Sequence, residues 1–139
     1  MSLEINDKEL QELVPKMRRA LETAHNLKAQ DLWGNLMQES PQNHGYLAGS
    51  WSLQQRGDLL SAISTHVVYA LVQNDGSDPY EIVPKNASAL RFEVNGQTIF
   101  AKRVQHPGIK GKQYIERSIE MTENRLEDFV AIGLAREGL

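Results

Sequence analysis

The sequence predicts an α+β fold, with one domain over residues 1–139. Apolar residues recur at helical spacing near each end of the chain, and alternating apolar and polar residues flank an Asn-Gly pair between them. A run of strands between separated helices is typical of an antiparallel sheet, here of about four or five strands, and disfavours a parallel α/β fold. The length fits one domain, and a hydrophobic fraction of 40% is enough for a core.

The first predicted element is a long N-terminal helix. Asn6-Asp7 is suited to cap it. The apolar residues that follow are three or four positions apart and make one stripe: Leu10, Leu13, Val14, Met17, Leu21, Ala24 and Leu27. Pro15 removes one helical hydrogen bond, so the helix either kinks at this residue or begins near Val14. We expect it to continue at least to Leu36 or Met37.

Strands are predicted in the middle of the chain. Residues 51–55 and 59–68 favour two strands, and Gly57-Asp58 favours a tight turn between them. The β-branched and aromatic run at residues 67–72 indicates that the second strand extends through it. Loops are expected where Gly, Pro, Asn and Asp gather, at residues 40–45, 74–79 and 105–112.

The strongest local signal is a hairpin at residues 90–101. Its Asn95-Gly96 pair favours a two-residue type I′ turn, because both turn positions need positive φ. The turn pairs Phe92 with Ile99 on an apolar face, which we expect to meet the helices. Phe100 then lies on the opposite, polar face, where a ring-forming protein would use it as an interface anchor.

A second amphipathic helix is predicted after the strands. Tyr114 stands at its start, and its apolar stripe consists of Ile115, Ile119, Leu126, Phe129 and Val130. The pattern fades in residues 133–138. The expected element order is therefore helix, strands, helix.

The composition excludes several classes of site. The chain has no cysteine, which removes disulfides, thiolate metal sites and cysteine nucleophiles. No apolar run approaches the roughly 20 residues that span a membrane. The acidic, mixed N-terminus is not typical of a signal peptide. We therefore expect no membrane association, and a protein made and used in a cytoplasm or in a particle assembled there.

The charges divide unevenly along the chain. Seven basic and two acidic residues lie between Lys85 and Arg117, a net charge of +5, so the remaining chain carries −8 within the total of −3. Unlike charged patches favour head-to-tail contact between copies, because they attract each other and fix register. An ordinary solvated surface with chance clustering explains the same pattern equally well.

No chemical motif points to catalysis. The histidines have neither zinc-site spacing nor a His-Glu-x-x-His motif: His25, His44, His66 and His106. Gly49-Ser50-Trp51 lacks the Gly-x-Ser-x-Gly elbow of serine hydrolases. Residues 108–112 have lysines beside glycines but lack the Walker spacing. We therefore predict no enzyme activity, no catalytic residue, no metal site and no cofactor.

The order of motifs resembles a known family. Ser40-Pro41 leads to Gly45, Leu47 and Ser50-Trp51, and Tyr69-Ala70 precedes Gly76. Residues 82–92 read Ile-Val-Pro-Lys-Asn-Ala-Ser-Ala-Leu-Arg-Phe, and residues 100–108 read Phe-Ala-Lys-Arg-Val-Gln-His-Pro-Gly. Over roughly residues 8–132, the chain is similar to the tail-component family of lambda-like siphophages, which covers neck, head–tail joining and tail-completion proteins.

One motif departs from that family. Its members often carry an Asp-Thr-Gly step where this chain has Asn43-His44-Gly45. The glycine and the leucine two positions later remain, so the turn is expected to form. The role that the family's acidic residue plays has no counterpart here.

The resemblance implies a structural virion protein. The expected subunit is α+β, forms rings that are often hexameric, and joins the tail to the head in the neck or at the tail end. Its expected partners are copies of itself, the tail tube and the head connector. The expected location is the virion, and the bacterial cytoplasm during assembly of the phage or prophage particle.

Candidate residues follow from the loops and the hairpin. Contacts with other subunits are expected from the hairpin and the basic segment after it, at Phe100, Lys102, Arg103, His106, Pro107, Gly108, Lys110 and Lys112. His106-Pro107-Gly108 is either a contact loop or simply a turn. Structural roles are expected for turn glycines and for core or hinge aromatics, at Gly45, Trp51, Tyr69, Asn95 and Gly96.

A second function class remains open. The basic segment from Lys85 to Arg117 also fits a nucleic-acid-binding module, because lysines and arginines neutralise phosphates. Few aromatic residues alternate with these basic residues, which counts against stacking on single strands. The two functions coexist if DNA passes through a ring whose lumen is basic.

Overall fold

The computed structural model describes residues 1–42 and 45–139. Asn43 and His44, where the chain departs from the family motif, lie outside the described residues. The chain divides into two compact units. The first unit contains residues 1–67 and 114–139, and the second unit contains residues 68–113. The predicted α+β class is confirmed, whereas folding as a single domain stays a prediction.

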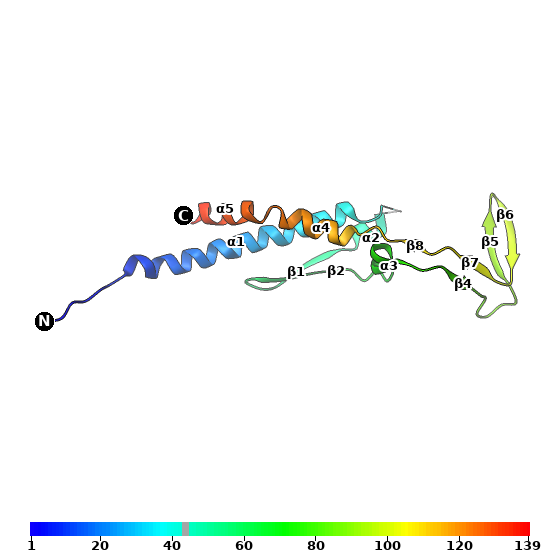
Figure 1. Ribbon diagram of the computed structural model, residues 1–139, viewed down its shortest axis with the longest axis horizontal. Helices are drawn as coiled ribbons and strands as arrows, with labels where there is room; N and C mark the ends of the chain where they lie inside the picture. The colour runs from blue at the N-terminus through cyan, green and yellow to red at the C-terminus, as the bar shows by residue number, and fades with distance from the viewer. Residues whose placement is uncertain (43–44) are drawn as a thin grey trace. The chain divides into compact units, whose positions relative to one another are not determined.

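The described residues of the first unit form four helices and one hairpin: α1 (Lys8–Glu39), α2 (Tyr46–Gly49), β1 (Ser52–Gly57), β2 (Leu60–Ser64), α4 (Tyr114–Glu123) and α5 (Leu126–Arg136). The chain of α4 and α5 runs back along α1 (Figure 1), so the predicted C-terminal helix is two helices in succession. β1 and β2 pair in antiparallel register, with Ser52 opposite Ser64.

Helix α1 begins before the proline and includes it. The carbonyl of Asp7 accepts a hydrogen bond from the Gln11 amide at 3.0 Å, so the helix does not begin near Val14. At the other end, the Ser40 amide and hydroxyl both donate to the Leu36 carbonyl. Pro41 follows, and a proline disfavours helical backbone in the residue before it. The sequence pattern therefore located this helix to within a few residues at its C-terminal end.

Small side chains let α5 approach α1 closely. Ala20 and Ala24 of α1 are buried, and so is Phe129 of α5. A Cβ atom added to Gly133 of α5 would collide with the Ala20 carbonyl oxygen, so the two helix backbones are in contact. The Arg19 guanidinium also pairs with the Glu137 carboxylate at 3.0 Å.

The second unit is one long arm on a short helix. Its elements are α3 (Ala70–Asp75), β3 (Gly76–Ser77), β4 (Tyr80–Ile82), β5 (Leu90–Val94), β6 (Gln97–Ala101), β7 (Val104–His106) and β8 (Ile109–Lys110). β3 pairs with β8, β4 with β7 and β5 with β6, each pair antiparallel. The chain therefore runs out and back on itself, and residues 76–110 are called the arm below.

The strands do not form the predicted single sheet of four or five. Eight strands form four separate two-stranded ribbons in the part of the chain that the structure describes. The nested pairing gives each strand of the arm one partner, and irregular residues 83–89 and 102–103 separate one pair from the next.

The predicted extension of the second strand is wrong. β2 ends at Ser64, and Ala70–Asp75 forms α3, with the Gln73 amide donating to the Tyr69 carbonyl at 2.9 Å. β-Branched residues favour strands because they pack on a pleated, half-buried surface. Leu71 and Val72 are exposed and have no such surface, so a short helix forms instead.

The predicted hairpin and its register are confirmed. Phe92 lies opposite Ile99, and Asn95 and Gly96 have φ angles of 51° and 79°, as a type I′ turn requires. The expectation that its apolar face is buried is wrong. Phe92 is 36% exposed and Ile99 is 37% exposed.

Two helical glycines give a matched test of the α1–α5 contact. Gly133→Ala adds a methyl group against the Ala20 carbonyl, and we expect it to lower the free energy of unfolding by about 1–3 kcal/mol. Gly34→Ala, in α1, places its Cβ in open space. We expect it to raise the free energy of unfolding by about 0.5–1 kcal/mol, because alanine favours a helix more than glycine does. Urea unfolding followed by circular dichroism measures both. A stabilising Gly133→Ala would contradict the close contact.

Candidate functional site

The arm has almost no interior of its own. Of the 46 residues of the second unit, all described, only Ala70 and Asn74 are buried. Every residue from 91 to 100 is exposed. A two-stranded hairpin alone in water is marginally stable at best. The arm therefore exposes apolar side chains whose burial would require another surface.

Side-chain alternation sorts the hairpin of the arm into two faces. The apolar face of the arm consists of Leu90, Phe92, Val94, Ile99 and Ala101, with Gln97 at the tip. Arg91, Glu93 and Thr98 lie on the opposite face. Phe100, which is 65% exposed, also lies there as the sequence predicted.

The predicted contact residues all lie on the returning half of the arm. Phe100 is in β6, His106 ends β7 and Lys110 ends β8. Lys102, Arg103, Pro107, Gly108 and Lys112 lie between or just after these strands. All of them are exposed except His106 and Gly108, which are half-buried.

His106-Pro107-Gly108 joins β7 to β8 within the ribbon, with His106 as the last residue of β7. The His106 ring stacks on Tyr80 across the β4–β7 pair, with ring centroids 4.6 Å apart, and its Nδ1 accepts a hydrogen bond from the Gly108 amide at 3.0 Å. Gly108 has a φ of 87°, and a Cβ there would collide with the Ser77 carbonyl. The two segments predicted as separate loops thus pair with each other through β3 and β8.

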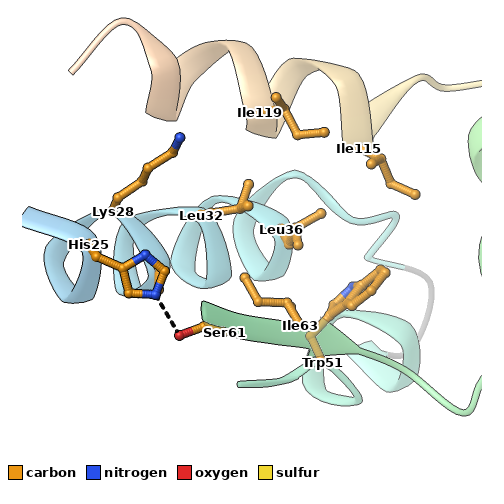
Figure 2. A pocket seen from close by; sticks show the side chains of 10 residues that line it. His25, Lys28, Leu32, Leu36, Trp51, Ser61, Ile63, Ile115 and Ile119 are labelled. Carbon is orange, nitrogen blue, oxygen red and sulfur yellow. Dashed lines mark hydrogen bonds between the residues drawn. The ribbon is translucent and has the colours of Figure 1, made fainter. Parts of the chain in front are cut away.

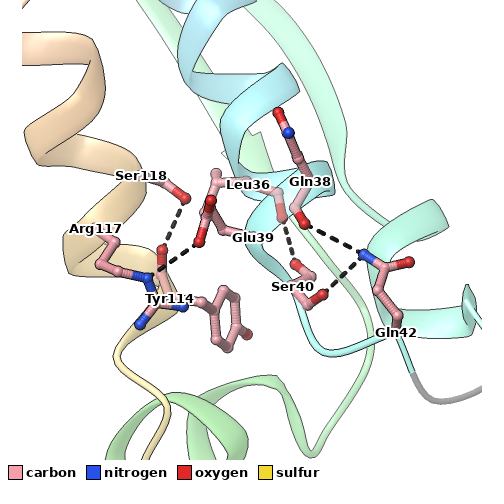
Figure 3. A network of polar contacts seen from close by, with 8 residues as sticks. All are labelled: Leu36, Gln38, Glu39, Ser40, Gln42, Tyr114, Arg117 and Ser118. Atoms are coloured by element: carbon pink, nitrogen blue, oxygen red, sulfur yellow. Dashed lines mark hydrogen bonds and ion pairs between the residues drawn. The ribbon is translucent and has the colours of Figure 1, made fainter.

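Not all of the predicted basic segment is available for contacts. Arg103 pairs with Glu81 at 3.1 Å, and Arg117 belongs to α4, where it pairs with Glu39 at 3.1 Å (Figure 3). Residues 85–112 still contain six basic residues and one acidic residue, a net charge of +5. Within the described residues, Lys85, Arg91, Lys102 and Lys110 are exposed and have no carboxylate partner.

A groove in the first unit provides a second candidate surface. A cavity of about 460 Å³ lies between α1, α4 and β2 (Figure 2). Its walls are mainly apolar: Ala29, Leu32, Leu36, Trp51, Ile63, Ile115 and Ile119. A second cavity of about 220 Å³ adjoins it at His25 and Lys28 and continues along α1 toward Leu21 and α5. The two cavities together are called the groove.

Polar side chains lie where the two cavities meet. His25 Nε2 lies 3.0 Å from the Ser61 hydroxyl, and Lys28 Nζ pairs with a Glu123 carboxylate oxygen at 2.9 Å. The His25–Ser61 pair was not expected from the sequence, because 36 residues separate its members. In the described part of the chain, the imidazole contacts no carboxylate that would orient it as a general base.

The groove forms because the face of α4 that is buried differs from the face that the sequence predicted. The residues of α4 that face α1 most closely are Tyr114, Ser118 and Thr122, all fully buried. Ile115 and Ile119, which the sequence predicted as the packing face, line the groove instead. Small polar residues permit a close approach of the helices and satisfy their hydroxyls locally, as Ser118 does at the Tyr114 carbonyl (Figure 3).

A polar network holds α4 and α5 on α1. Asp31 Oδ2 accepts hydrogen bonds from Thr122 Oγ1 at 2.9 Å and from Asn35 Nδ2 at 3.0 Å, and Asn35 Nδ2 also donates to Thr122 Oγ1. Arg125 pairs with the other Asp31 oxygen. The sequence gave no signal for this network, since its members occupy ordinary polar positions of separate helices.

The predicted structural residues have different surroundings. Trp51 Nε1 donates to the Ser40 hydroxyl at 2.9 Å, and the Trp51 carbonyl accepts from Trp33 Nε1 at 2.9 Å. Trp51 is half-buried, and these two bonds tie it into the first unit. Tyr69 is 40% exposed at the start of α3, so it is not a core residue. Gly45 has a φ of 68° and begins α2.

The described residues contain neither a cluster of metal ligands nor a membrane-spanning helix. No cluster of three or more potential metal ligands occurs in residues 1–42 and 45–139. Within the same ranges, no helix has the length and apolar character needed to cross a membrane.

Comparisons with family models, curated proteins and solved structures gave no match to this chain.

The Asp31 network is testable by a double-mutant cycle. Thr122→Val keeps the side-chain shape but removes the hydroxyl, and we expect a loss of about 1–3 kcal/mol in the free energy of unfolding. In an Asp31→Ala background the same change should cost at least about 0.5 kcal/mol less, because its main partner is already absent. Urea unfolding of the four proteins gives the coupling. Additive losses would contradict the network.

Proposed function

We propose that the chain is a structural subunit of a tailed bacteriophage or prophage particle. It forms a ring in the neck or at the tail end, joins the tail to the head and catalyses nothing. The observation that carries this proposal is the arm. It presents a long and partly apolar ribbon, and none of its residues 76–110 is buried.

The cost of ordering the arm supports a role in assembly. Fixing a backbone residue costs about 1–2 kcal/mol of conformational entropy, and burial of apolar surface is the main term that offsets it. Residues 91–100 obtain little of that burial within one copy. A partner that covers the arm supplies it, as happens for segments that become ordered on binding.

The resemblance to phage tail components supports the same role from the sequence. Its most specific part is the Pro-Lys-Asn-Ala…Ala-Leu-Arg-Phe block at residues 84–92 paired with His106-Pro107-Gly108, and these two motifs lie on the outgoing and returning halves of the arm. These two motifs lie on either side of the segment from Phe92 to Phe100, which contains the tip of the hairpin. The segments that carry the resemblance are thus those that a neighbouring subunit or a tail protein would contact.

Particle assembly tests this proposal. In a phage or prophage that encodes the chain, deleting its gene should yield separate heads and tails, or unfinished tails, in electron micrographs. A plasmid copy should restore joined, infectious particles, and a copy with the arm deleted (residues 77–109) should not. Joined particles that form at normal frequency without the gene would refute the proposal.

Nucleic-acid binding is the second candidate, favoured by the exposed basic side chains of the arm. With up to four phosphate contacts, a plot of log affinity for duplex DNA against log salt should have a slope of about −4 to −3. Replacing Lys85 and Lys102 with alanine should reduce the steepness by about 2. A fluorescence titration at several salt concentrations measures this slope. A flat response would exclude DNA contact.

A further inference from the structure

We infer that the arm of one copy docks into the groove of a second copy. This inference rests on the proposed function and names the contact that would connect neighbouring subunits. The apolar face of the arm is the inserted surface, and α1, α4 and β2 of the other copy form the receiving surface. Contact between unlike surfaces repeats from copy to copy and closes into a ring when the rotation permits.

The two surfaces match in chemistry. The arm offers Phe92 and Ile99 side by side on one face. The groove offers Leu32, Ile63 and Ile119, with its polar groups confined to the junction of the two cavities (Figure 2). Both surfaces are exposed to water in a single copy, so covering their apolar side chains favours association.

The two surfaces also match in size. The groove follows α1 from Leu21 to Leu36, which is about 22 Å at the helical rise per residue. Each strand of the β5–β6 hairpin has five residues and extends about 17 Å. The apolar face of the hairpin is therefore short enough to lie along the groove over its whole length.

Charge favours the same pairing. The segment from Lys85 to Lys112 carries +5, whereas the first unit has nine basic and fourteen acidic residues, a net charge of −5. Exposed carboxylates of α4 directly follow the groove-lining isoleucines in sequence, at Glu116 and Glu120, and Glu123 pairs with Lys28 of the groove. Opposite charges steer the arm toward the groove and disfavour contact between two arms.

Disulfide trapping tests the contact directly, because the chain has no cysteine. One copy carries Ile99→Cys on the arm. The other carries Ile119→Cys on the α4 wall or Ile63→Cys on the β2 wall, together with an affinity tag that separates products by mass. A disulfide requires Cβ atoms about 4 Å apart, so only a hairpin seated in the groove will form one efficiently. We expect a covalent heterodimer on oxidation of the mixture with at least one of the two walls.

The adjacent residue provides a matched control. Thr98 is the residue before Ile99 in β6 and is also exposed, but its side chain lies on the opposite face of the hairpin. Thr98→Cys therefore differs from Ile99→Cys mainly in the face that carries the thiol. We expect it to give only background heterodimer with either groove variant. Each groove variant alone should also remain a single chain, with a mass of 15.7 kDa plus that of its tag. Circular dichroism of each variant verifies that the first unit is folded.

Other products would overturn the inference. The first is an oxidised mixture that contains no heterodimer. The second is a heterodimer that Thr98→Cys forms as efficiently as Ile99→Cys. The third is a chain carrying both Ile99→Cys and Ile119→Cys that forms a disulfide only within itself. These results leave the assembly proposal standing if particles still require the gene. Conversely, efficient trapping in a chain that particles do not require refutes the proposed function while establishing the contact.

Discussion

Gly133 of α5 lies against the carbonyl of Ala20 in α1, and the geometry of the first unit depends on this close approach of two backbones. Small or hydroxyl-bearing residues of α4, Ser118 and Thr122, continue the contact. Because the helices meet through small side chains, the larger Ile115 and Ile119 are displaced to the edge of the contact, where they line the groove. The groove is therefore a direct result of how the helices pack.

Local signals in the sequence determine local structure well here. Asn95-Gly96 needs positive φ at both positions, and that requirement alone fixes the register of β5 and β6. The apolar stripe and Pro41 located α1 because both act within one or two turns. The predicted contact residues from Phe100 to Lys110 follow one another along the returning half of the arm, because a ribbon keeps the order of the sequence, and Lys112 lies just after it.

Longer-range features escaped prediction for an equally physical reason. The groove collects side chains from three distant segments, such as Lys28, Ile63 and Ile119, and no spacing in the sequence reports that they meet. Periodicity in α4 indicated the isoleucines as its buried face, because it weighs apolar character and ignores how closely small residues permit helices to approach. The pairing of β3 with β8 joins two segments with loop composition, which turn propensity cannot reveal.

The two faces of the arm allow its two proposed roles to coexist. Side-chain alternation puts Phe92 and Ile99 on the face that would enter a neighbour's groove, and Arg91 and Phe100 on the other. Docking by the apolar face would bury no cation that lacks a partner, so the penalty for burying an unpaired charge is avoided. Arg91 then stays in water, where it is free to meet a phosphate or another particle component. The alternation that gives the arm an apolar face would thereby keep a basic, aromatic surface accessible in the proposed ring.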